Sequence, residues 1–246
     1  MKRLTGLLAV LLAMVCMPAA QAALEIDFSF DGGPRTFLAV GPDTGPVVVP
    51  VLPIAVPGGA FTVTVLSANS NSPGTPTLAD VMSATLTVSN TGSGTHTLEL
   101  FIGAQNFTAP TAPPNPALLF SSHIGGSVTT GSPANLLSFT SCVDPTNSLL
   151  TCPVGAPIVA GPGTPNIKVS ASSFSDDKFT TIGALGAGFS IEQDIVLTLG
   201  SGSILNFSTN SQLTPVPEPI SISLLGGVIL LVIGSIRRKR NQAHQV

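Results

Sequence analysis

The sequence predicts an all-β protein, in which a β-sandwich of immunoglobulin-like or jelly-roll type is followed by one C-terminal transmembrane helix. Apolar and polar residues alternate with a period of two along most of the chain, which is typical of strands that bury one face. Before the C-terminal apolar run, no segment of useful length has the helical period. Turns rich in Gly, Ser and Asn and loops rich in Pro separate the alternating runs, as in the many short strands of a sandwich.

The first predicted strand begins at Leu24, where apolar residues alternate with acidic and hydroxyl residues up to Gly32-Gly33. Comparable alternation predicts further strands around 61–65, 84–89, 98–102, 167–171, 189–199 and 204–208. The run 47–52 is expected to form a short edge strand because Pro50 interrupts it. The pattern leaves the order of the strands open.

Two turns are expected to close hairpins. The segment 90–95, Asn-Thr-Gly-Ser-Gly-Thr, connects the strand at 84–89 to the strand at 98–102. The segment 200–203, Gly-Ser-Gly-Ser, connects the long strand at 189–199 to the last one at 204–208. We therefore expect each pair of strands to be neighbours in a sheet.

The N-terminus has the three parts of a secretory signal peptide. Lys2 and Arg3 give a positive start, and residues 4–17 form an apolar core. Ala20, Gln21 and Ala22 then supply a small-x-small cleavage site before Ala23. We expect residues 1–22 to be removed on export and the exported β-sandwich domain to span 23–212.

The C-terminus has the parts of a membrane anchor. A Pro-rich linker at 213–219 precedes an uncharged apolar run at 220–236, which as a helix is about 25 Å long and close to the thickness of a bilayer core. The last segment, 237–246, begins with four cations that favour the cytoplasmic side. These cations are Arg237, Arg238, Lys239 and Arg240.

The linker contains Val216, Pro217, Glu218 and Pro219, whose prolines favour an extended and accessible backbone. This motif, the apolar run and the basic end together resemble the PEP-CTERM sorting signal of Gram-negative bacteria that make extracellular polysaccharide. The resemblance covers about residues 215–240. It implies an exosortase-type membrane protease as partner, anchoring in the inner membrane before processing, and then the cell surface or the extracellular space. An ordinary single-pass anchor is the alternative, and the resemblance implies nothing about the exported domain.

Charge and cysteine content describe the exported domain further. Residues 23–212 carry eleven carboxylates and three cations, which argues against nucleic acid as a partner. Cys142 and Cys152 are the two cysteines left after export, and in an oxidising compartment they are expected to form a disulfide that closes a small loop. A redox pair and half of a metal site are the alternatives, and neither has further His or Cys nearby.

The sequence contains no recognisable catalytic constellation, so we expect neither an enzyme nor a cofactor. Asp27, Asp31, Asp176 and Asp177 are candidate Ca²⁺ ligands, and the competing interpretation is a solvated strand face and a polar turn. His96 is expected to face the solvent. The chain has no Trp or Tyr to stack on sugars, so that role would fall to a phenylalanine. The candidates for it are Phe101, Phe107 and Phe120, and the simpler interpretation is that each is a core or hairpin residue.

Two functional hypotheses follow from these observations. The first is a non-enzymatic cell-surface or extracellular-matrix protein that is sorted through its C-terminal signal. The second is a module that binds extracellular polysaccharide, with calcium as a possible aid. Metal-dependent retention on polysaccharide would distinguish them.

Overall fold

The computed structural model of the protein describes residues 24–41, 47–49, 61–111, 117–132, 135–149, 167–168 and 173–216. Within these ranges the secondary structure consists of strands, and no helix has the length and apolar character needed to cross a bilayer. The expected signal peptide, the apolar run at 220–236 and the basic end lie outside the described residues, as do Pro217, Glu218 and Pro219. The strands are β1 (Leu24–Phe30), β2 (Thr36–Gly41), β3 (Val47–Val49), β4 (Phe61–Ser70), β5 (Ala79–Asn90), β6 (His96–Phe107), β7 (Ala117–Thr130), β8 (Leu136–Asp144), β9 (Ile167–Lys168), β10 (Ser173–Gly183), β11 (Phe189–Leu199) and β12 (Ile204–Pro215).

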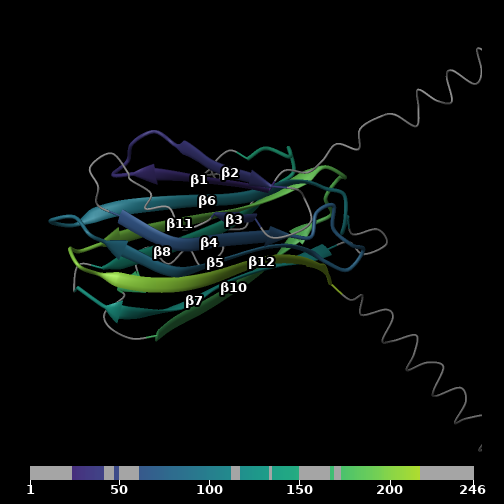
Figure 1. Ribbon diagram of the computed structural model, residues 1–246. Coiled ribbons are helices and arrows are strands. Elements are labelled where there is room, and N and C mark those ends of the chain that lie inside the picture. The colour runs from purple at the N-terminus through teal and green to yellow at the C-terminus, as the bar shows by residue number, and fades with distance from the viewer. Residues whose placement is uncertain are drawn as a thin grey trace, which may run out of the picture.

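The strands form two six-stranded antiparallel sheets, which confirms the predicted all-β sandwich (Figure 1). One sheet, called the β11 sheet, has the order β2-β1-β6-β11-β8-β9. The other, called the β12 sheet, has the order β10-β7-β12-β5-β4-β3. The predicted edge strand is β3, at one margin of the β12 sheet. Each sheet buries one face against the other, as the alternating pattern requires.

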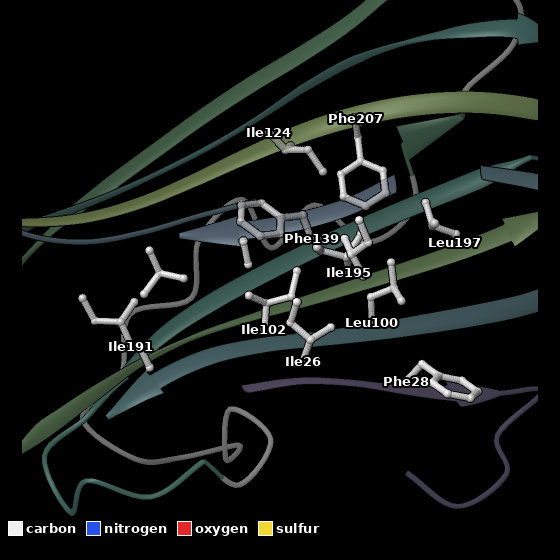
Figure 2. Packing of buried hydrophobic residues seen from close by; sticks show 14 of the residues in the cluster. Ile26, Phe28, Leu100, Ile102, Ile124, Phe139, Ile191, Ile195, Leu197 and Phe207 are labelled. Atoms are coloured by element: carbon white, nitrogen blue, oxygen red, sulfur yellow. The ribbon is translucent and has the colours of Figure 1, made fainter. Parts of the chain in front are cut away.

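The core lies between these two inner faces and is built from aliphatic and Phe side chains. Figure 2 shows Ile26, Ile102 and Ile195 of the β11 sheet on one side of the core, with Ile124 and Phe207 of the β12 sheet on the other. All five are nearly fully buried. Burying each such side chain stabilises the fold by roughly 1.5–3 kcal/mol, so the apolar face of every long strand holds the two sheets together.

Both hairpin predictions are wrong. β5 belongs to the β12 sheet and β6 to the β11 sheet, so the segment between them crosses from one sheet to the other. The segment from β11 to β12 does the same in the opposite direction. The turns are where the sequence placed them, but the two strands on either side of each turn do not pair with each other. β5 pairs with β12, and β6 pairs with β11, so the two crossings lie side by side.

The C-terminal end of the folded domain also differs from the prediction. β12 continues to Pro215, Leu213 within it is fully buried, and the Val216 amide donates to the Ala117 carbonyl at 3.1 Å. The folded unit therefore extends past residue 212 and into the first residues assigned to the linker. Leu213 cannot belong to a free linker, because its side chain is part of the core.

Candidate functional site

The four predicted Ca²⁺ ligands are not brought together. Asp27 is buried and forms an ion pair with Arg35, with 2.7 Å between Oδ2 and Nε. Asp31 lies in the turn after β1, whereas Asp176 and Asp177 lie on β10 in the other sheet. Among the described residues, no group of three or more His, Cys, Asp or Glu side chains is arranged to hold a metal. The polar turn expected at Asp176-Asp177 is in fact part of a strand.

The side chain of Asp31 is hydrogen-bonded to His96, so it is not arranged as a metal ligand. Its Oδ2 lies 2.8 Å from His96 Nδ1, and its Oδ1 accepts the Thr97 amide at 2.7 Å. Burial alone would raise the pKa of Asp31, but these hydrogen bonds outweigh it and lower the pKa. The hydrogen bond to Asp31 also raises the pKa of His96. His96 stacks on Phe30 with its side chain only 26% exposed, so it faces the solvent less than expected.

The outer face of the β12 sheet carries a row of larger side chains across five strands. Cross-strand register places these residues opposite one another, from β4 through β5, β12 and β7 to β10. The flanking residues on β5, β12 and β7 point into the core, so the row faces outward. We call it the polar row; it consists of Asn69, Met82, Asn210, His123 and Asp177.

A second row, next to the polar row, contains only small residues. Its members are Ser67, Ala84, Ser208, Gly125 and Ser175, again in register across the same five strands. Because these side chains are short, they leave a groove of about 340 Å³ that is lined by both rows. At Gly125 even a Cβ would lie 3.1 Å from His123 Nε2, so the missing side chain makes room for the imidazole ring.

A smaller hollow of about 220 Å³ lies on the other side of the polar row. It is lined by Ser121, Gln212 and Asp177, and it shares His123 and Asn210 with the larger groove. The two hollows therefore adjoin along the polar row. Together they form a recessed strip. The larger groove exposes mainly apolar surface between its amide and hydroxyl groups, and the smaller hollow exposes mainly polar atoms.

Two side chains of the polar row have polar atoms that no described residue satisfies. His123 Nδ1 lies 2.7 Å from Asp177 Oδ1, which fixes the ring and leaves Nε2 beside the floor of the groove. Asn210 Oδ1 is buried and accepts no hydrogen bond from any described residue. Buried polar atoms in native proteins are normally paired, so a ligand or water is expected at Asn210.

Phe179 adds an aromatic ring to the same face. It lies on β10 opposite Ser121, next to the smaller hollow, and is 74% exposed. The three phenylalanines considered from the sequence are buried: Phe107 and Phe120 in the core, and Phe101 beneath Arg35. Phe179 was not among the predicted site residues, because no strand was predicted at β10. Residues 175–178 are all polar, so no period-two alternation marks this strand in the sequence.

The outer face of the β11 sheet is acidic but covered. Segment 144–149 lies over it: Arg35 Nη1 donates to the Leu149 carbonyl at 3.1 Å, and Gln105 Nε2 donates to the Asn147 carbonyl at 2.9 Å. Burial raises the pKa of Glu192 to about 8 and that of Asp194 to about 7. Cys142 is buried on β8, and Cys152 lies outside the described residues, so the disulfide stays a prediction.

No protein-family model and no curated protein matches the sequence. Solved structures that resemble the fold include the carbohydrate-binding module TmCBM61 in complex with β-1,4-galactotriose, with 6% identity, 61% of this chain and 88% of that chain covered, and a TM-score of 0.31. The adhesin domain of Epf from Streptococcus pyogenes has 7% identity, 80% and 60% coverage, and a TM-score of 0.35. A family 35 carbohydrate-binding module from Clostridium thermocellum has 9% identity, 68% and 98% coverage, and a TM-score of 0.22.

Proposed function

We propose that the protein is an exported, non-enzymatic polysaccharide-binding protein and that the outer face of the β12 sheet is its binding site. The observation that carries the proposal is the polar row, with a hollow on each side and the exposed Phe179 ring at its margin. Sugars present hydroxyl groups that both donate and accept hydrogen bonds, and they have apolar ring faces. A recessed strip of amide, imidazole and hydroxyl groups beside an aromatic ring matches both properties.

The individual side chains have distinct roles in this proposal. Asn210 Oδ1, which has no described partner, would accept a hydrogen bond from a sugar hydroxyl. His123, oriented by Asp177, would bind a second hydroxyl through Nε2. Phe179 would stack on one sugar ring, and Met82, 37% exposed, would contact another. We do not include calcium in the proposal, because the candidate ligands lie in different sheets or, like Asp27, form an ion pair with another side chain.

The spacing of the carboxylates on this face supports a non-catalytic role. Asp80 and Asp177 both point outward, but their strands β5 and β10 are three neighbours apart in the sheet. Three strand spacings amount to roughly 14 Å, whereas the two carboxylates of a glycosidase lie about 5–9.5 Å apart. The face therefore suits binding better than hydrolysis. We also favour the jelly-roll form of the sandwich, because most connections cross between the sheets.

Binding can be tested with two matched variants. Phe179→Ala removes the exposed ring of the binding face, and Phe37→Ala removes a ring that is 59% exposed on β2 of the other sheet. In affinity electrophoresis with the producer's extracellular polysaccharide, Phe179→Ala should weaken binding about tenfold, as expected for one stacking contact. Phe37→Ala should bind like the wild type. Equal binding by both variants and the wild type, or no binding by any, would contradict the proposal.

We further propose that the C-terminal segment is a PEP-CTERM signal that delivers this domain to the cell surface or the extracellular matrix. The proposal rests on Val216, Pro217, Glu218 and Pro219 together with the apolar run and the basic end. The intact mass of the mature protein, compared between strains with and without exosortase, tests it. A product ending near the motif that disappears in the deletion strain supports sorting. An unchanged chain retained in the membrane of both strains identifies a plain anchor.

A further inference from the structure

The charged side chains on the binding face indicate which kind of polysaccharide it would bind. This inference rests on the proposed function. The row beyond the polar row runs through Asp80, Gln212, Ser121 and Phe179 in register. Across this row, the polar row and the small-residue row, the described side chains include the carboxylates of Asp80 and Asp177 but no Lys or Arg. Lys178 follows Asp177 along β10, and strand alternation directs it to the opposite face. Apart from the His123 imidazole, the ionisable side chains of these three rows are therefore carboxylates.

Neither carboxylate has a Lys or Arg side chain of the described residues beside it. Asp177 Oδ1 lies 2.7 Å from His123 Nδ1, and the Asp177 side chain is largely exposed. Asp80 is only 6% exposed, its Oδ1 accepts no hydrogen bond from a described residue, and burial raises its pKa. Protein sites for carboxylate or phosphate groups use Arg or Lys, and this face has neither among its described residues. An anionic sugar placed along the polar row would meet like charge at Asp177.

The shape of the site points to a polymer. The polar row crosses five strands, which at a spacing of about 4.8 Å corresponds to roughly 19 Å between its ends. At one end it reaches Asp177 on β10, the margin of the sheet, so a ligand can continue past the edge. A strip of this length, recessed on both sides of the row, suits several consecutive sugar rings better than a single terminal sugar.

We infer that the outer face of the β12 sheet binds an uncharged polysaccharide chain that runs across the strands along the polar row, and that it discriminates against polysaccharides bearing carboxylates. Hydroxyl groups of such a chain would donate to the exposed carboxylate of Asp177 and to the side-chain oxygen of Asn210, a residue that lines both hollows. Binding of this kind depends on hydrogen bonds and stacking, so sodium chloride has little effect on it. An anionic polymer, in contrast, would be repelled, and salt would reduce that repulsion.

The test uses the mature protein and the acidic fraction of the producer's extracellular polysaccharide, before and after chemical reduction of its carboxylates to primary alcohols. The neutral fraction serves as a second probe. The protein should bind the neutral fraction and the reduced polymer at least about fivefold more tightly than the unreduced polymer, the effect of one close like-charge contact. Asp177→Asn should narrow this difference by improving binding to the unreduced polymer. Asp176→Asn, on the other face of the same strand, should leave it unchanged.

Three other outcomes have distinct meanings. Tighter binding to the unreduced acidic polymer, weakened by salt, would overturn the inference of an uncharged ligand while leaving polysaccharide binding intact. Absence of binding to all three polymers would overturn the proposed function and the inference together. Equal affinity for reduced and unreduced polymer, unaffected by Asp177→Asn, would show that the carboxylates on this face do not select the ligand.

Discussion

The side-chain oxygen of Gln193, on the inner face of the β11 sheet, accepts a hydrogen bond of 2.6 Å from the hydroxyl of Thr209, on the inner face of the β12 sheet. The same oxygen accepts from Ser83, while Gln193 Nε2 donates to the Val81 carbonyl at 2.8 Å and to Ser211 at 3.0 Å. Residues of the opposite sheet thus satisfy both donor and both acceptor positions of this buried amide. Polar contacts therefore fix how the two sheets align, in addition to the apolar core.

Gln193→Leu should destabilise the protein by about 3 kcal/mol. The apolar side chain fills the volume, but the Val81 carbonyl and the Ser211 hydroxyl lose a buried partner, and each unsatisfied group costs about 1–3 kcal/mol. Urea unfolding of the purified protein measures the change. Gln212→Leu, on the outer face of β12, is the control and should stay within about 0.5 kcal/mol of the wild type. Equal stability of the two variants would show that the network does not align the sheets.

Asn90 joins the two crossings between the sheets. Its amide donates to the Ser203 carbonyl at 3.0 Å, and its carbonyl accepts from Gly202 at 2.9 Å. Its side-chain nitrogen donates to the Leu199 carbonyl at 2.6 Å and to the Gly94 carbonyl at 3.0 Å. Asn90 is 1% exposed, so its polar groups depend on these hydrogen bonds and not on water.

Asn90→Asp should therefore destabilise the protein by about 2–4 kcal/mol, because a carboxylate of the same shape cannot donate to either carbonyl and is buried beside both. Thermal unfolding at neutral pH measures the loss. Asn69→Asp on the outer face of β4 is the matched control, since its side chain is partly exposed and has no comparable role. A melting temperature for Asn90→Asp close to that of the control would argue against this role of Asn90.

These two residues show which parts of the fold could be predicted. The Asn-Thr-Gly-Ser-Gly-Thr segment correctly marks a turn after Asn90, and alternation correctly marks the strands on each side. A strand leaving such a turn can return within its own sheet or cross to the other, and in both cases it buries one face. The local pattern is therefore the same, and the choice depends on partners more than a hundred residues away, such as Leu199 for Asn90.

The same limit applies to the candidate site. The polar row combines residues from Asn69 to Asn210, and their contact depends on sheet order, which the sequence left open. Asp27 was correctly placed opposite the apolar face of β1, yet it is buried. The cover comes from segment 144–149, held through Arg35, and no pattern near Asp27 indicates such a cover. Burial of an outer face is thus a property of the whole fold.

Arg35 is predicted to stabilise this cover. Its guanidinium pairs with Asp27, lies 4.2 Å from the centre of the Phe101 ring, and donates to the Leu149 carbonyl. Arg35→Ala should cost about 2–4 kcal/mol, because it leaves the buried Asp27 carboxylate unpaired. Hydrogen exchange at 144–149 should accelerate in this variant, and Arg35→Lys should restore part of the protection. Lys178→Ala, an exposed cation on β10, should change neither quantity.

The acidic face of the β11 sheet predicts that stability declines as pH rises. Burial, opposed by Arg35 and reinforced by the charges of Asp144, Asp194 and Glu25, raises the pKa of Glu192 from 4.5 to about 8. Burial and Glu99, again opposed by Arg35, raise the pKa of Asp194 from 3.8 to about 7. At pH values between the ordinary pKa of each group and its raised pKa in the native state, the native state binds more protons than the unfolded state. The contribution of these two carboxyl groups to stability is therefore fully present below about pH 4 and is lost progressively up to about pH 8.

Urea midpoints measured from pH 5 to pH 9 should accordingly decrease with pH. Glu192→Gln keeps the shape of the side chain without the charge, so it should reduce the slope and make the protein more stable than the wild type at pH 9. At pH 5 the two proteins should be nearly equal, because Glu192 is then protonated in the native state. Asp177→Asn removes an exposed carboxylate from the other sheet and should leave the slope unchanged. A wild-type midpoint that rises across this range would show that Glu192 and Asp194 are ionised beneath segment 144–149, with Arg35 compensating both.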